Sequence, residues 1–316
     1  MQTQRIFLQT HEPLSFTFKQ TKDDFFVEEI ANGTFKGKGN FLILKIKKQS
    51  LSTWELLSII SEVLGIEEHL IGYAGLKDKN ATTIQYISIP INRSKEYRQL
   101  NSKNIKVLET FKHDQKLKIG NLLGNKFKIR LKDIDPTSLP IIYQTISQIQ
   151  KHGLPNYFGF QRFGKESNFE KSKRICFGEE ILKDKKLEKF MKLAYQSYFF
   201  NAWLAKRVEL SKEQNSNKLL SLEGDIFNLH DRTIITGLLP GRDILRAKNE
   251  ARELEEQYDD LFIHDKGYRR DAWIKPENIK NKYEKENNSM LLEFTLPKSS
   301  YATVFIENLA NKNFEY

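Results

Sequence analysis

The sequence predicts an α+β protein in which a β-rich domain is interrupted by a mainly helical insertion. Segments rich in β-branched and aromatic residues precede Pro136, helical spacing of apolar residues follows it, and strand character returns only with MLLEFTLP at 290–297. At 316 residues the chain is long enough for two domains, which usually hold roughly 100 to 200 residues each. We therefore expect a mixed or antiparallel sheet and a second domain made mainly of helices.

The first half of the chain begins with three predicted strands, SFTFKQT, DFFVEEI and FLILKIKK. Ser52 and Glu55 have the spacing of a capping box, so an amphipathic helix is predicted to begin there and to end at Gly65. Further strands are predicted at 81–90, 105–111 and 126–134 because these segments are again rich in β-branched and aromatic residues.

The second half is predicted to be helical. Helices are expected at 138–152, from Asn168, at 187–208 and at 249–262, and Gly153 is expected to end the first of them. A last helix at 301–310 is expected to have Ser299 or Ser300 as its N-cap.

Lysine and arginine outnumber aspartate and glutamate by 51 to 41, which gives a net charge of +10. A polyanion is therefore the first partner to consider, although charge alone does not decide the matter. The single cysteine, Cys176, excludes an internal disulfide and favours a reducing compartment. Neither a signal peptide nor an apolar run of membrane-spanning length is found, so we expect a cytoplasmic protein without membrane contact.

Several reaction classes lack their sequence signals. The six histidines are scattered, with no HxxxH or HExxH spacing and no cysteine partners, so we expect no metal site. The GxSxG motif of many serine hydrolases is also absent.

The segment GYAGLKDKNATTIQYISIP (72–90) places Asp78 in a polar, glycine-rich loop directly before a predicted strand. Loops held by a rigid scaffold often carry function. The residues KDKN are equally typical of a solvated turn, so composition alone does not assign Asp78 a role.

The strand predicted at 126–134 has an apolar face and a cationic face. The cationic face serves either solubility or contacts with phosphates. The ring of Phe127 on the other face serves either packing or stacking on a base, which is worth ~1–3 kcal/mol. The cationic residues are Lys126, Lys128, Arg130 and Lys132.

In NYFGFQRFG (156–164), aromatic residues alternate with glycines and Arg162. Exposed aromatic rings beside an arginine suit unstacked RNA bases. Buried rings would instead join two domains, and the position of the segment at the start of the helical part favours that interpretation.

Together these segments resemble the TruD family of transfer RNA pseudouridine synthases. AGLKDKNATTIQ (74–85) resembles the family motif AGxKDxxAxTxQ, and GNKF (124–127) resembles GNxF. NYFGFQRFG (156–164) matches NYFGxQRFG, and the three motifs occur in the family's order.

Weaker matches extend the resemblance over nearly the whole chain: KQTKDDFFVEE, SYFFN and LPKSSYATVFIENL. Two positions depart from the family pattern. Lys22 stands where the family has proline, and Tyr301 stands where the family has a base-contacting phenylalanine. Tyrosine keeps the aromatic ring but adds a hydroxyl group near the uracil.

The resemblance implies a pseudouridine-synthase catalytic domain formed by residues 1–152 and 277–316, interrupted by a TRUD insertion domain at 153–276. It implies isomerisation of uridine to pseudouridine, at position 13 of certain transfer RNAs, without a cofactor. Transfer RNA is the expected partner, and we expect a monomer.

The same resemblance assigns roles to individual residues. Asp78 takes the role of nucleophile, and Lys19 is by alignment the candidate counterion that keeps it ionised. Lys77 and Lys79 are adjacent in sequence and are expected to point away from it. Contacts with the base are assigned to Phe25, Asn125 and Tyr301, with Phe127 as a stacking wall. Since Phe25 and Phe26 face opposite ways, one of them is expected in the core.

Two other functions stay open at this point. A non-catalytic RNA-binding protein, such as an RNA chaperone, would use the same basic and aromatic residues and would bind RNA without Asp78. A metal-dependent nuclease would use some of the carboxylates and would be stopped by EDTA, but the spacing of metal ligands is missing.

Overall fold

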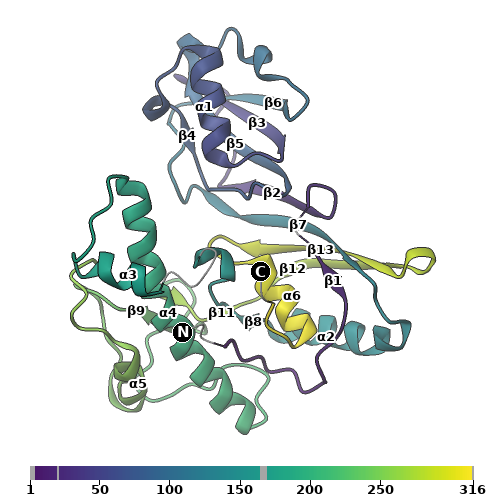
Figure 1. The fold of residues 1–316 in the computed structure, drawn as a ribbon, viewed down its shortest axis with the longest axis vertical. Coiled ribbons are helices and arrows are strands. Elements are labelled where there is room, and N and C mark those ends of the chain that lie inside the picture. Colours follow the sequence, from purple (N-terminus) through teal and green to yellow (C-terminus); the bar gives the residue numbers. More distant parts are fainter. Residues whose placement is uncertain (1–3, 20, 164–168, 315–316) are drawn as a thin grey trace. The chain divides into compact units, whose positions relative to one another are not determined.

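The computed structural model of the protein describes residues 4–19, 21–163 and 169–314. Two units are distinguished by their packing, and each is assembled from separate stretches of the chain (Figure 1). The sheet unit consists of Ser15–Pro136 and Glu277–Ser299. The helical unit consists of Met1–Leu14, Thr137–Pro276 and Ser300–Tyr316. The predicted α+β class, with a sheet whose sequence is interrupted by helical residues, is confirmed.

The sheet unit contains one mixed sheet, with nine strands among the described residues, in the order β12-β13-β7-β2-β5-β3-β6. β1 pairs with β7, β4 pairs with β5, and only the pair of β2 and β5 is parallel. The strands are β1 (Thr17–Phe18), β2 (Phe25–Ala31), β3 (Phe41–Gln49), β4 (Gly72–Tyr73), β5 (Thr82–Pro90), β6 (Ile105–His113), β7 (Leu122–Lys132), β12 (Glu277–Glu284) and β13 (Ser289–Pro297).

All strands predicted before Pro136 are present, but the expectation that strand character returns only at residue 290 is wrong. β12 precedes it and forms an edge of the sheet. Its sequence ENIKNKYE is mostly charged and lacks apolar alternation. An edge strand needs no apolar faces, and its charges discourage pairing with other chains, so the usual signal is missing.

Helix α1 (Thr53–Leu64) follows the prediction closely. The side chain of Ser52 accepts a hydrogen bond from the backbone of Glu55, whose carboxylate accepts one from the backbone of Ser52. Gly65 ends the helix in the left-handed conformation, with φ at 59°. Glycine takes this conformation without the steric cost of a Cβ atom.

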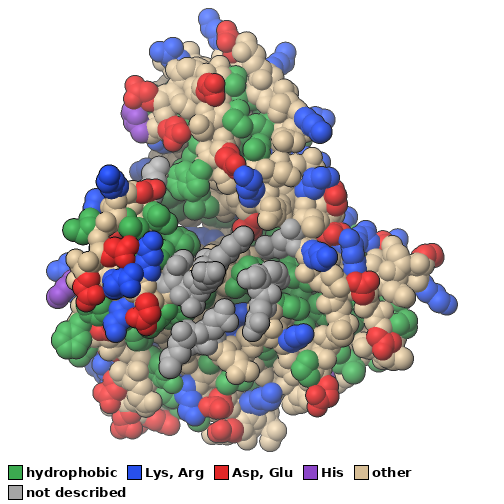
Figure 2. Space-filling view, in the orientation of Figure 1, with side chains coloured by type: hydrophobic (Ala, Val, Ile, Leu, Met, Phe, Trp, Pro, Cys, Tyr) green, Lys and Arg blue, Asp and Glu red, His purple; other side chains and the backbone are tan. Residues whose placement is uncertain are grey.

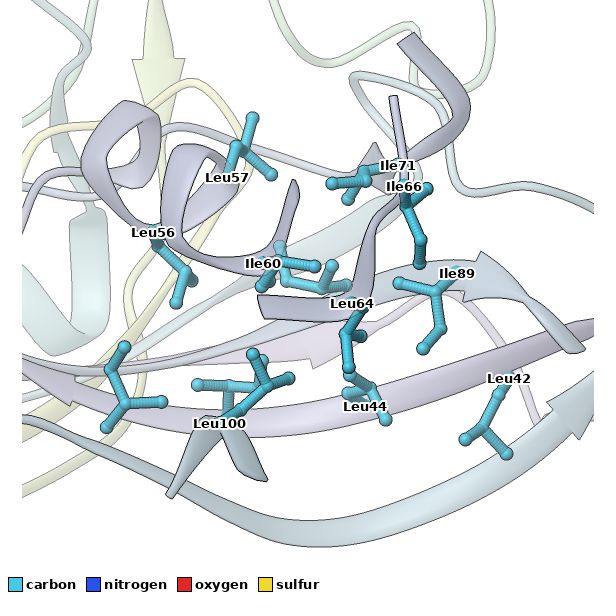
Figure 3. Packing of buried hydrophobic residues seen from close by; sticks show 13 residues of the cluster. Leu42, Leu44, Leu56, Leu57, Ile60, Leu64, Ile66, Ile71, Ile89 and Leu100 are labelled. Carbon is cyan, nitrogen blue, oxygen red and sulfur yellow. The ribbon is translucent and has the colours of Figure 1, made fainter. Parts of the chain in front are cut away.

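The core of the sheet unit lies between α1 and one face of β3 and β5. Leucine and isoleucine side chains of α1 point onto those of the strands, and most of them are fully buried (Figure 3). The members include Leu44, Leu56, Ile60 and Ile87, each with no exposed surface. This packing fixes the position of the first turn of α1 against the sheet.

The helical unit contains α2 (Leu139–His152), α3 (Phe169–Cys176), α4 (Lys185–Glu213), α5 (Asn249–Glu255) and α6 (Ala302–Ala310). Two small antiparallel pairs accompany them: β8 (Leu154–Pro155) with β11 (Trp273–Ile274), and β9 (Thr236–Leu239) with β10 (Tyr268–Asp271). The predicted domain bounds, 1–152 plus 277–316 and 153–276, stay a prediction, and the packing units divide the chain elsewhere because α2 and α6 belong to the helical unit.

Two helix predictions in this unit need correction. α6 has Tyr301 at its N-cap rather than Ser299 or Ser300, and no side chain caps it. Ser299 has φ at 66°, and the buried hydroxyl of Ser300 has no hydrogen-bond partner among the described residues. α5 ends at Glu255, earlier than expected, and Asn168, the predicted start of another helix, lies outside the described residues.

None of the described helices combines the length and apolar character that crossing a membrane requires. Cys176 is buried beside Tyr195 and Ile263. Burial raises the pKa of its thiol to about 12, which leaves it protonated and unreactive at neutral pH.

We predict that Ile60→Ala lowers the free energy of unfolding by about 2–5 kcal/mol, because it opens a cavity under α1. Urea denaturation followed by circular dichroism measures the change. Ser58→Ala, on the exposed side of the same helix, is the control and should change stability by less than about 0.5 kcal/mol. Equal effects of the two substitutions would contradict the described packing.

Candidate active site

Asp78 lies in the loop between β4 and β5, beside the first turn of α1. The backbone N–H of Lys77 donates to Oγ1 of Thr53 at 2.8 Å. Nζ of Lys79 lies 2.6 Å from Oε1 of Glu55 in the capping box. Both neighbours of Asp78 are therefore attached to the start of α1.

The side chain of Lys48 on β3 binds the backbone of this loop. Its side chain is fully buried, and Nζ donates to the backbone carbonyls of Leu51 and Asp78, the latter at 3.2 Å. Burial lowers the pKa of Lys48 to about 8, against the opposing effect of the Asp78 charge. The sequence analysis missed this residue, although Lys48 falls in the same alternation as the buried Leu44 and Ile46.

A buried ion pair attaches the same loop to the middle of the sheet. Nζ of Lys77 lies 2.8 Å from Oε1 of Glu29 on β2, with 7% and 0% of the two side chains exposed. The other carboxylate oxygen of Glu29 accepts a hydrogen bond from the backbone N–H of Tyr86 on β5 at 2.8 Å. β2 pairs with β5 only as far as Glu28, so the backbone of β2 offers no acceptor to the N–H group of Tyr86. The side-chain carboxylate of Glu29 accepts that hydrogen bond instead.

Asn125 on β7 lies directly opposite Glu29 in the antiparallel pair of β2 and β7, so both side chains are on one face of the sheet. Asn125 is 9% exposed, and its buried Oδ1 has no hydrogen-bond partner among the described residues. The preceding Gly124 allows a close approach of β13, since a Cβ atom there would lie 2.2 Å from the carbonyl oxygen of Leu296.

Phe25 and Phe127 occupy the same face of the sheet as Asn125, and both are buried, at 2% and 6% exposure. Their ring centroids are 6.1 Å apart, and Phe127 stacks on Phe294 at 5.5 Å. Of the neighbours Phe25 and Phe26, it is Phe25 that lies in the core. Both rings pack against other rings in this structure, and their contact with a base stays a prediction.

Asp78 itself is exposed to solvent, and no described residue donates a hydrogen bond to its carboxylate. Desolvation by the protein on its other sides raises the pKa of the carboxyl above its usual value, while the charges of Lys77 and Lys48 act in the opposite direction. Asp78 therefore combines an exposed residue position with a partly desolvated carboxyl group that has no hydrogen-bond donor among the described residues.

Lys19 and Tyr301 are not joined to this cluster by any described contact. Lys19 follows β1 and is exposed, and among the described residues it forms no ion pair. Tyr301 belongs to the helical unit, where its ring centroid lies 6.1 Å from that of Phe158. The roles assigned to both residues stay predictions.

The cationic face of β7 has the predicted alternation, but carboxylates of neighbouring strands accompany its charges. Lys128 lies 3.1 Å from Glu293, and Lys132 lies 2.7 Å from Asp24. In Figure 2, Lys and Arg side chains lie next to Asp and Glu side chains over β12 and β13. This face is therefore closer to neutral than the sequence of β7 alone indicates. In the described ranges, no group of three or more His, Cys, Asp or Glu residues is arranged to hold a metal ion.

Comparison with known proteins gives consistent results. The sequence model of the family described as "tRNA pseudouridine synthase D (TruD)" matches residues 3–193. The tRNA pseudouridine synthase D of Nitratiruptor sp. is 37% identical, with 98% of this chain and 99% of that protein covered. The enzyme of the same name from Wolinella succinogenes is also 37% identical, with 99% of each covered. A solved structure, that of a putative tRNA pseudouridine synthase D (TruD) from Methanosarcina mazei, shares the fold with a TM-score of 0.70. It is 22% identical in sequence, and the match covers 98% of this chain and 97% of that one.

The family match places this chain in the class of pseudouridine synthases, which are isomerases. It belongs to the tRNA pseudouridine synthase D (TruD) family. The resemblance stated from the three motifs is thereby confirmed.

We predict that the stability difference between the wild type and Lys48→Met depends on pH. The pKa of Lys48 is about 8 in the folded protein, against an ordinary value of 10.5. Between these two pH values, Lys48 is still protonated in the unfolded chain but has lost its proton in the folded one. Wild-type stability should therefore rise relative to the variant, by about 2 kcal/mol between pH 7.5 and 10. Urea denaturation at several pH values measures the difference.

Lys47→Met, on the opposite face of β3, is the matched control and should show no such trend. A pH-independent difference for Lys48→Met would mean that Lys48 is not buried as described.

Proposed function

We propose that this protein converts uridine to pseudouridine in transfer RNA, at position 13 of certain transfer RNAs, with Asp78 as nucleophile and without a cofactor. The observation that carries the proposal is that Asp78 is an exposed residue on a loop whose backbone is held by Lys48, Thr53 and, through the Lys77 side chain, Glu29. The family membership supplies the reaction class.

The reaction exchanges one bond of the ribose for another. The bond from C1′ to N1 of uracil breaks, the base turns, and a bond from C1′ to C5 forms. C5 loses a proton and N1 gains one, so no other group enters or leaves. Asp78 supplies the carboxylate that attacks the nucleotide, either at C1′ of the ribose or at C6 of the base. The covalent bond keeps the sugar or the base attached to the enzyme while the base turns. The nucleotide must first leave its stack, at a cost of about a few kcal/mol.

Asp78 must be ionised to act as a nucleophile. Desolvation works against this by raising the pKa of its carboxyl, and the cations Lys77 and Lys48 counteract it. We propose Lys19 as a further counterion in the RNA complex, on the basis of the family alignment.

Asn125 is proposed to hold the uracil edge. Its buried Oδ1 lacks a donor among the described residues, and the N3–H group of uracil is a donor of the right kind. Unpaired buried acceptors are costly, so a substrate donor would be bound strongly. Phe25 and Phe127 support this strand face from the core, and the ring of Tyr301 is proposed as the further base contact.

The remaining proposals concern the setting of the enzyme. Transfer RNA as the partner follows from the names of the relatives and agrees with the net charge of +10. A cytoplasmic location agrees with a single, buried cysteine. We propose that the protein acts as a monomer.

Asp78→Asn is expected to fold normally and to form no pseudouridine, because the amide is isosteric with the carboxylate but is a poor nucleophile. Tritium release from 5-tritiated uridine in transfer RNA measures turnover, and the thermal transition reports folding. Asp114→Asn, an exposed carboxylate of the same unit, is the control and should retain activity. Full turnover by Asp78→Asn would refute the assignment, and RNA binding by a wild type without turnover would favour a non-catalytic RNA-binding protein.

Asn125→Ala is expected to lower kcat/KM by roughly 10- to 100-fold while leaving the thermal transition nearly unchanged. The physical reason is that Oδ1 of Asn125 has no hydrogen-bond partner among the described residues, so its removal costs the fold no hydrogen bond there but takes away the proposed acceptor for uracil. Steady-state tritium release and thermal melts give the two quantities. A large loss of stability with unchanged kcat/KM would assign Asn125 to the fold.

A further inference from the structure

Two arginines of the helical unit share one aromatic ring. The guanidinium carbon of Arg270 on β10 lies 3.9 Å from the ring centroid of Phe158, and that of Arg162 lies 5.1 Å from it. Both distances are within the range of cation–π contact. Phe158 and Arg162 belong to the NYFGFQRFG segment, which takes no part in the proposed reaction.

The ring and both arginines are held in place by polar contacts. Asn201 of α4 accepts from the backbone N–H of Phe158 at 2.8 Å and donates to its carbonyl at 2.9 Å. Arg270 donates to the carbonyl and the side-chain oxygen of Asn156 at 3.1 and 2.9 Å. Arg162 uses only Nε, which donates to Oγ of Ser197 at 3.2 Å. The two terminal nitrogens of Arg162 have no described partner.

Neither guanidinium forms an ion pair with a carboxylate among the described residues. Asp271, which follows Arg270 in sequence, accepts instead from Asn228 at 2.7 Å. Other buried or half-buried arginines of this unit are paired: Arg5 with Glu307, Arg207 with Asp225, Arg246 with Asp259 and Arg269 with Glu255.

Such a pair of cations is unfavourable without an anion. Burial, together with the charge of Arg162, lowers the pKa of Arg270 to about 10 against the opposing effects of Tyr301 and Asp271. The ring of Phe158 compensates part of the desolvation, but it does not remove the repulsion between two like charges. An anionic ligand would offset both the desolvation of the guanidinium groups and the repulsion between them.

The surroundings indicate the kind of anion. Guanidinium groups present planar, paired donors that match the oxygens of a phosphate. The ring centroid of Tyr301, the proposed base contact, lies 6.1 Å from that of Phe158. A Cβ atom on Gly159 would lie 3.0 Å from Cδ1 of the Tyr301 ring, so glycine allows this close approach. A base on Tyr301 would therefore bring its own or a neighbouring phosphodiester into the vicinity of the arginines.

We infer that Arg162 and Arg270, mounted on Phe158, form a binding site for a phosphodiester of the RNA next to the nucleotide that contacts Tyr301. The inference rests on the proposed function for the identity of the RNA. Arg162 makes the contact with its terminal nitrogens, which have no partner among the described residues, and Arg270 adds charge from its fixed position over the ring.

The test measures the dissociation constant of a transfer RNA transcript at several salt concentrations for the wild type and for Arg162→Gln, both in the Asp78→Asn background. One lost phosphate contact should make the slope of log K against log salt less steep by about 0.7 to 0.9. Binding should weaken about ten-fold or more at low salt. Arg162→Lys keeps the charge and should keep the wild-type slope.

Arg174→Gln is the matched control, because Arg174 is an exposed arginine of the same unit paired with Glu180 at 3.1 Å, and its slope should not change. An unchanged slope in folded Arg162→Gln would overturn the inference and leave the arginines as a structural clamp on Phe158. If Arg162→Gln shows no cooperative thermal transition, Arg270→Gln is measured in its place. Loss of folding in both would also overturn the inference.

The proposed function is tested separately by tritium release from the protein with Asp78 intact. A changed slope without turnover in that protein would retain the phosphate site and reject the reaction. Turnover with an unchanged slope would retain the reaction and reject the site.

Discussion

The buried ion pair between Lys77 and Glu29 is the interaction on which the proposed site depends. It joins a loop to the sheet at the position where β2 stops pairing with β5, and the same carboxylate completes the hydrogen bonding of Tyr86. Removing either partner would leave an uncompensated charge in the interior. Since Asn125 lies opposite Glu29, the residue that anchors the loop of Asp78 is also the neighbour of Asn125 in the sheet.

The elements that the sequence predicted well have strong local signals. The capping box and Gly65 define α1 by contacts within a few residues, and β3 and β5 are long runs of β-branched and apolar residues. The elements that were missed depend on partners far away in the chain. β12 is a strand because β13 pairs with it, and α6 begins after Tyr301 without a serine cap.

The site shows the same division. Asp78 was found through its motif, but Lys48 was not, because its importance comes from burial beneath a loop 30 residues away in sequence. Lys77 was expected to point away from Asp78, and its orientation stays a prediction, but the sequence did not indicate that it pairs with Glu29 or that its charge acts on Asp78. Phe127 was expected as a wall for the base, yet its ring stacks on Phe294, a partner that only the register of β7 and β13 brings near.

The glycine before Asn125 limits how this site can change during evolution. Any side chain at position 124 would collide with the backbone of β13, and the strands would have to separate beside the residue proposed to read the base. Selection at position 124 therefore acts on the spacing of two backbones, even though glycine offers no chemistry to a substrate. A glycine of this kind is required by the packing of two strands, so it should persist even where specificity for the base has changed.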